Sequence, residues 1–102
     1  MYRYTTPTLP VTIDDIDFDD VSVFRIAIEQ DSVEMLKVID IDDPSVDAQH
    51  KTVYVPLTQE ETASLKAGMV EVQARIKFVN NSVMSTNKVK LSVNDVLDEV
   101  II

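Results

Sequence analysis

The segment MVEVQARIKFV (69–79) indicates the fold class, because its side chains alternate between apolar and polar from Val70 to Phe78. The apolar face holds Val70, Val72, Ala74, Ile76 and Phe78, and the polar face holds Glu71, Gln73, Arg75 and Lys77. Such alternation is typical of a β-strand that buries one face and exposes the other. The turn residues 80–82 follow, and Val83–Val93 then continues as a second strand. Its inward residues are Val89, Leu91 and Val93, and its outward residues are Lys88, Lys90 and Ser92. We therefore predict a long antiparallel hairpin over 69–93.

The first half of the chain shows the same rhythm in shorter pieces. Strands are predicted around 8–13, at 21–30, at 34–41 and at 51–57, with inward residues Leu9, Val11, Ile13, Phe24, Ile26, Ile28, Val53, Val55 and Leu57. Pro7 and Pro10 lack a backbone donor, so the first strand should lie at a sheet edge. The inward face of 34–41 stays open, because Leu36 and Val38 compete with Ile39 and Ile41.

Two segments break the strand pattern. Thr58 and Glu61 have the spacing of a capping box, which predicts a short helical turn near 59–67, ended by Gly68 in a left-handed conformation. Asn94-Asp95 can cap a second short helix from Val96 to about Ile101. Residues 1–102 then form one domain, an antiparallel immunoglobulin-like β-sandwich of about six to seven strands.

Composition limits the functions open to this domain. The chain has 102 residues with no cysteine, one histidine and one glycine, so thiolate metal sites, cysteine nucleophiles and glycine-rich phosphate loops are excluded. The net charge of −9 argues against non-specific binding to nucleic acid or an anionic membrane. No apolar run matches a membrane span or the core of a signal peptide. We expect a protein that is not an enzyme.

The charge is unevenly placed along the chain. Residues 1–50 carry three basic and twelve acidic residues, and 51–102 carry six of each. Much of the acid lies in the runs 14–20 and 40–43. In the first run, Asp15, Asp17 and Asp19 match the first three ligand positions of a calcium loop. The later positions do not match: Asp20 stands where glycine is needed and Ile26 where glutamate is needed. The alternative is a solvated acidic loop, held down by Ile16 and Phe18.

Two further groups are candidate interaction sites. Arg75, Lys77, Lys88 and Lys90 project from the outer face of the predicted hairpin. They form either a solvated face or a basic patch that docks on an acidic surface, such as 14–20 and 40–47 of a neighbouring copy. The apolar residues Val100, Ile101 and Ile102 either close the core or face a partner. His50 is expected to be exposed, and nothing in the sequence assembles Ser45, His50 and Asp47 into a catalytic site.

The chain also resembles a family of small prophage-encoded structural proteins of Gram-positive bacteria. The residues that carry the likeness are Thr6-Pro7-Thr8, Leu57–Thr62, the Glu71/Gln73/Arg75 strand and Val93–Ile101. The arrangement is also similar to the immunoglobulin-like N-terminal module of phage baseplate upper proteins. The resemblance implies a phage or virion structural role without catalytic residues.

The sequence thus leads to a non-catalytic phage or prophage accessory protein that assembles with another structural protein or with itself. It would act in the virion or in the host cytoplasm during assembly, without a cofactor. One alternative is a calcium- or carbohydrate-binding module, in which Tyr2, Tyr4 and Tyr54 are the aromatic candidates. Another is an acidic inhibitor or DNA mimic of a mobile element.

Overall fold

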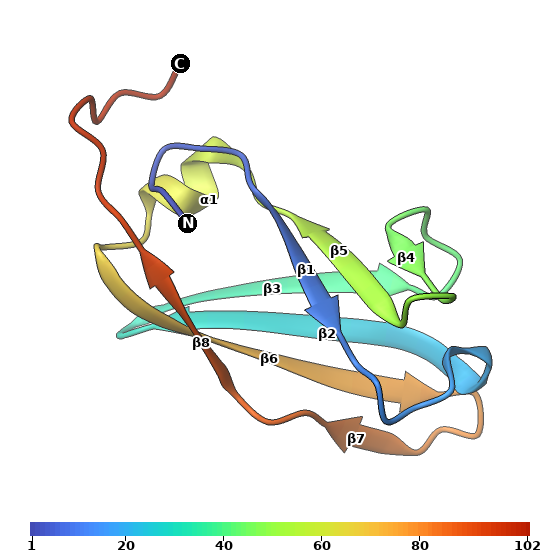
Figure 1. The fold of residues 1–102 in the computed structure, drawn as a ribbon. Coiled ribbons are helices and arrows are strands. Elements are labelled where there is room, and N and C mark those ends of the chain that lie inside the picture. The colour runs from blue at the N-terminus through green and yellow to red at the C-terminus, as the bar shows by residue number, and fades with distance from the viewer.

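Two antiparallel β-sheets pack face to face in the computed structural model, which describes residues 1–102 (Figure 1). The small sheet has the order β1 (Thr8–Thr12), β5 (Thr52–Pro56), β4 (Val46–Asp47). The large sheet has the order β3 (Val33–Asp40), β2 (Val21–Gln30), β6 (Gly68–Phe78), β7 (Val83–Ser85), and β8 (Val89–Val93) also pairs with β6. A 3-10 turn, η1 (Phe18–Asp20), and one short helix, α1 (Gln59–Ala63), join the sheets. The chain is an all-β sandwich, as the alternation predicts.

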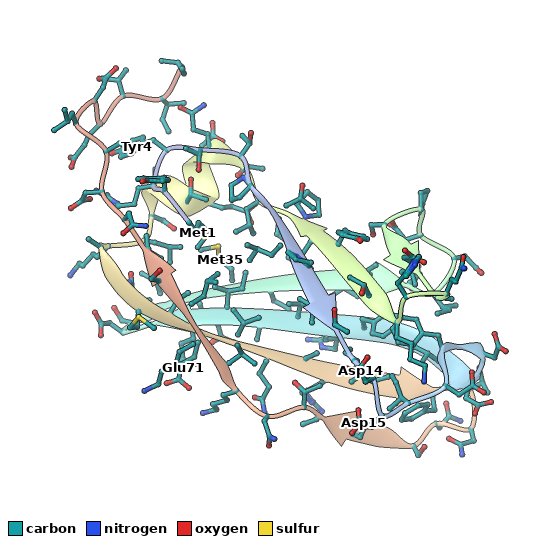
Figure 2. All side chains as sticks on the ribbon, in the orientation of Figure 1. Met1, Tyr4, Asp14, Asp15, Met35 and Glu71 are labelled. Carbon is teal, nitrogen blue, oxygen red and sulfur yellow. The ribbon has the colours of Figure 1, made fainter.

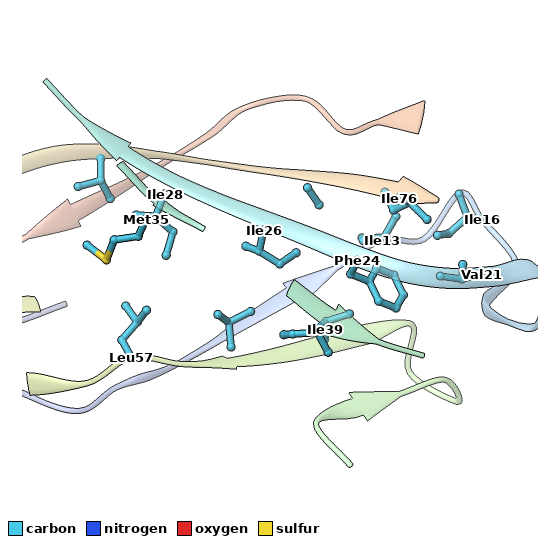
Figure 3. Packing of buried hydrophobic residues seen from close by; sticks show 14 of the residues in the cluster. Ile13, Ile16, Val21, Phe24, Ile26, Ile28, Met35, Ile39, Leu57 and Ile76 are labelled. Atoms are coloured by element: carbon cyan, nitrogen blue, oxygen red, sulfur yellow. The ribbon is translucent and has the colours of Figure 1, made fainter. Parts of the chain in front are cut away.

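The core lies between the sheets and comes from the predicted inward faces. Phe24, Ile26 and Ile28 of β2 are completely buried (Figure 3). Val53 and Val55 of β5 are completely buried as well. The open question in 34–41 is settled by the register of β3 against β2, which pairs Ile39 with Phe24 and Leu36 with Ala27. Cross-strand partners share a face. Ile39 is therefore buried, whereas Leu36 and Val38 are exposed.

The loop 14–20 is anchored as the sequence predicts. Ile16 and Phe18 are buried, and the Phe18 ring lies 5.1 Å from the Phe24 ring. The Asp17 carboxylate accepts the backbone N–H of Asp19 and so caps η1. The acidic residues consequently stay at the surface while the loop is held to the sandwich.

The strand predicted over Val83–Val93 is interrupted, and this is a correction. Arg75 pairs with Ser85 but Val72 pairs with Val89, so the second strand holds one residue more than β6 between these pairs. Thr86 spans the irregularity: its hydroxyl accepts the N–H of Ala74 at 3.0 Å, and its own N–H donates to the Ala74 carbonyl. This β-bulge divides the strand into β7 and β8. With the two-residue β4, it raises the strand number to eight, above the predicted six to seven.

The predicted turn near 59–67 is confirmed as α1, with the full capping box between Thr58 and Glu61. The role predicted for Gly68 is wrong, because the helix ends at Ala63 and Gly68 begins β6 with φ +135. The second helix, predicted from Val96 to about Ile101, is also wrong: that segment contains no helix. Its β-branched residues disfavour a short helix, and Asp95 pairs with Arg3 instead of capping one.

The sandwich is elongated, with extents of 46 × 25 × 18 Å. The acidic loops lie together at one end, because β2 begins where β3 ends, with Val23 paired to Asp40. The segment Asn94–Ile102, which we call the tail, leaves the body at the opposite end, near α1 (Figure 1). None of the helical segments has the length and apolar character needed to cross a bilayer.

Candidate functional site

A groove of about 710 Å³ runs between the two sheets along one flank of the sandwich. Leu9 and Val11 of β1 form one wall, and Met84, Val89 and Leu91 of β7 and β8 form the other. The groove exists because β1 is the edge of the small sheet and leaves the inner face of β8 uncovered. Val89 accordingly is 62% exposed although it points toward the interior of the sandwich.

Both walls of the groove are edge strands. β1 pairs only with β5, and β7 and β8 pair only with β6. Near its end, β8 is covered by the first residues of the chain: the Met1 nitrogen donates to Ser92 O, Met1 O accepts Asn94 N–H, and Arg3 N–H donates to Asn94 O. Backbone groups on one side of a strand recur at every second residue. Those of Lys90 and Lys88 therefore point to the same side, beyond the covered part of the edge.

The tail exposes several apolar side chains. The exposed side chains are Leu97, Val100, Ile101 and Ile102, and Ile102 is 96% exposed. Polar contacts hold the tail: Arg3 pairs with Asp95 at 2.8 Å and with Glu99 at 3.3 Å, and the Gln59 amide exchanges two hydrogen bonds with the backbone of Ile102. The prediction that Val100–Ile102 closes the core is wrong, and the alternative, a segment that faces a partner, remains.

The predicted basic side chains lie on one surface, the outer face of the large sheet. Arg75, Lys77, Lys88 and Lys90 are all exposed there. The register adds Arg25, which the sequence analysis missed, because it is the cross-strand partner of Arg75 on β2. Arg25 can be assigned to this face only from its pairing with Arg75, and that pairing depends on the order of strands in the sheet.

Carboxylates share this outer face with the basic residues. Glu29 is the cross-strand partner of both Glu34 and Glu71. Glu71 in turn pairs with Lys90 in register, and its carboxylate lies 4.0 Å from the Lys88 ammonium. On the neighbouring strand β3, the exposed side chains of Leu36 and Val38 lie on the same outer face. The outer face therefore mixes both signs of charge. Lys88 and Lys90 lie beside Glu71, and Arg25, Arg75 and Lys77 lie further along the strands, toward Asp40.

The first acidic loop, 14–20, does not form a metal site. Asp14 and Asp15 lie at the end of the groove beside β7, far from Tyr4 and the tail (Figure 2). No group of three or more histidine or carboxylate side chains is placed to hold a metal ion, so the structure does not bring Asp15, Asp17 and Asp19 together as a site.

Two carboxylates in the segment 40–47, those of Asp43 and Asp47, have lowered pKa values. The backbone N–H and hydroxyl of Ser45 both donate to Asp43 and lower its pKa. A hydrogen bond to the exposed His50, 2.7 Å away, lowers the pKa of Asp47. Because the Ser45 hydroxyl donates to Asp43, it does not join the His50–Asp47 pair.

The aromatic candidates for sugar binding lie on separate elements. Tyr54 is exposed on β5, and Tyr2 is exposed where it bridges to Asn94. The Arg3 guanidinium lies over the Tyr4 ring, 5.2 Å from its centre. The three rings thus do not form one stacking surface.

Comparison with known proteins found no match to the chain among family models, curated proteins or solved structures.

Proposed function

We propose that this chain is an immunoglobulin-like assembly module of a phage or prophage. It acts as a virion structural or accessory protein through contacts with another structural protein or with further copies of itself. The observation that carries the proposal is the exposed apolar tail, which polar contacts hold at the surface although its side chains could gain by burial. The resemblance in sequence supplies the phage assignment.

The physical argument for a protein partner combines the tail with the strand edges. Monomeric domains usually protect edge strands, because unpaired N–H and C=O groups recruit other strands. They also rarely expose contiguous apolar side chains without a binding role. Here the tail exposes three successive apolar residues, Val100 to Ile102, and β8 leaves part of its edge open. Both features are stabilised when a partner covers them.

Charge gives such contacts a direction. The basic residues of the outer face and the acidic loops at the end of the body are complementary in sign. Opposed charges at an interface raise the association rate and select orientation more than they add affinity. On this proposal the module acts as an oriented connecting piece, and the resemblance in sequence supplies its location in the virion, or in the host cytoplasm during assembly.

The test is incorporation into particles. A tagged chain is expressed in the strain that encodes it, the prophage is induced, and particles and assembly intermediates are separated on a density gradient. We expect the chain to sediment with one of these species at a constant ratio, measured by quantitative mass spectrometry. A chain found only in the free protein fraction at every stage would contradict the proposal.

A charge variant tests the role of the outer face in the same experiment. The double variant Arg75→Glu/Lys77→Glu should reduce incorporation, since both side chains are exposed and make no ion pair within the chain. Lys66→Glu is the control, because Lys66 is exposed and lies in the connection between α1 and β6, outside the strands of the sheet. Equal incorporation of the double variant and the control would remove the outer face from the proposal.

A further inference from the structure

We propose that the tail of one copy occupies the groove of a second copy as an added β-strand, so that copies join head to tail. The inference rests on the proposed function, because it names the partner of the assembly surface. It requires the tail to match the groove in chemistry, in the pairing of backbone groups and in charge, and it requires a reason why the tail does not fill the groove of its own chain.

The chemistry matches. The groove is lined by apolar side chains from both sheets, with Leu9 and Val11 on one wall and Val89 and Leu91 on the other. Val100 and Ile102 are two residues apart, so in an extended strand both point to the same side. Directed into the groove, they would cover Val89, whose inward side chain is 62% exposed in the single chain.

The backbone can also pair. The edge of β8 at Lys88 and Lys90 is open, and an antiparallel strand beside it would bond to these backbone groups. Four extended residues, 99–102, span about 13 Å. That length covers the stretch 87–90 and would extend the large sheet by one strand, as in other complexes formed by β-strand addition. Asp98 then stays before the paired stretch, so its carboxylate is not directed into the groove.

The side-chain charges favour one direction for the added strand. Asp14 and Asp15 lie at one end of the groove, and Lys90 lies near the other. The tail carries its acids, Asp98 and Glu99, before its apolar residues. If the tail enters at the Lys90 end, Glu99 lies beside Lys90 on the outer face and Val100 lies beside Val89 in the groove. The opposite direction would bring the tail acids close to Asp14 and Asp15.

The tail cannot reach this position within its own chain while the N-terminal residues hold their place. Folding back against its own β8 would require a hairpin turn at Asn94-Asp95. The backbone of Asn94 is bonded on that side to Met1 and Arg3, and Asp95 is paired with Arg3. A second copy supplies the same strand without using this turn.

The experiment uses two complementary variants of the full chain. Val89→Asp blocks the groove but keeps the tail, and the double variant Val100→Asp/Ile102→Asp blocks the tail but keeps the groove. All three side chains are exposed in the single chain, so each variant should fold, as circular dichroism checks. Mass in solution is measured by light scattering at concentrations up to about 1 mM, where contacts of micromolar to millimolar affinity associate.

We expect the unmodified chain to form species larger than a monomer that grow with concentration, and each variant alone to be monomeric. An equimolar mixture of the two variants should form a dimer and stop there, because one free groove meets one free tail. Val79→Asp is the control, since Val79 is 68% exposed outside the groove, and it should associate like the unmodified chain.

Three results would overturn the inference: a monomeric unmodified chain at every concentration, unchanged association of Val89→Asp, or a mixture that stays monomeric. The gradient experiment on particles separates this failure from failure of the proposed function. A monomeric chain that enters particles refutes the tail-in-groove contact alone, and a chain that joins head to tail but never enters particles refutes the phage assignment alone.

Discussion

The two flanks of the large sheet follow the same alternation but differ in what covers them. On the β2–β3 flank, the inward residues Phe24, Ile26 and Ile39 are buried against the small sheet. On the β7–β8 flank, the inward residue Val89 is largely exposed beside the edge of β1. The difference shows that alternation determines which face a side chain occupies, whereas the width of the opposing sheet determines whether that face is buried.

The largest expected effect is on the covered flank. Phe24→Ala should lower the free energy of unfolding by about 3–5 kcal/mol, because it removes a completely buried ring and leaves a cavity. Urea denaturation followed by circular dichroism measures the change. Leu36→Ala on β3 is the control, with an outward side chain and an expected loss within about 0.5 kcal/mol. Similar losses in the two variants would mean that the two faces of the sheet are not distinguished as described.

The second effect concerns the contact that positions β1 above the groove. Thr62 of α1 is completely buried, and its hydroxyl accepts the Thr5 N–H at 3.1 Å and donates to Thr5 O at 2.8 Å. Thr62→Val keeps the shape but leaves the Thr5 backbone without these partners, at a cost of about 1–3 kcal/mol. Denaturation measures it against Thr6→Val, an exposed site. A loss in Thr62→Val no larger than in Thr6→Val would show that the hydroxyl does not hold β1 in place.

Much of the strand and helix pattern could be predicted from the sequence, because the signals are local. The inward face of β2 follows from alternation, the start of α1 follows from the spacing of Thr58 and Glu61, and the edge position of β1 follows from Pro7 and Pro10. Each of these depends on residues a few positions apart. In each case the residues that determine the structure lie in or next to the element that they form.

The open flank could not be predicted in the same way, because its features depend on distant residues. Val89 has the pattern of a buried residue, and only the place of β1 in the other sheet exposes it. In the sequence Thr86 is an ordinary polar residue. In the structure its hydroxyl accepts the hydrogen bond from the Ala74 N–H that a backbone carbonyl would accept in a regular ladder. The sequence of the tail predicts a capped helix. In the structure the Asp95 carboxylate instead accepts a hydrogen bond from Arg3, which is 92 residues away in the sequence.

A third, smaller effect is the pH dependence of the link between α1 and β3. Partial burial would raise the pKa of Glu61, but hydrogen bonds from Lys37, 2.7 Å away, and from the Thr58 N–H outweigh it and lower the pKa below its ordinary value of 4.5. A lowered pKa in the folded chain means that the carboxylate stabilises the fold above its unfolded pKa. This stabilisation is lost as the pH falls through the folded pKa.

Glu61→Gln tests this link. We expect the unmodified chain to lose stability between about pH 5 and pH 3, and Glu61→Gln to lose less over that interval, by up to about 1 kcal/mol. Denaturation curves at several pH values measure the difference. Glu60→Gln is the control, because Glu60 is exposed on the same helix and its carboxylate forms no ion pair. Equal pH dependence in Glu61→Gln and the unmodified chain would show that the Lys37–Glu61 pair does not stabilise the fold.

The smallest effect is expected on the open flank and is the most direct test of the comparison. Val89 and Val93 lie on the same face of the same strand, four residues apart, but Val93 is 3% exposed and Val89 is 62% exposed. Val93→Thr places a hydroxyl in the core and should cost about 1–3 kcal/mol. Val89→Thr should change stability by no more than about 0.5 kcal/mol when measured on dilute, monomeric protein. If the two substitutions cost the same in dilute solution, β1 closes over β8 in the single chain, and the groove is not free to receive a strand. If the cost of Val89→Thr rises with protein concentration while that of Val93→Thr does not, the open flank is the surface that a second copy covers.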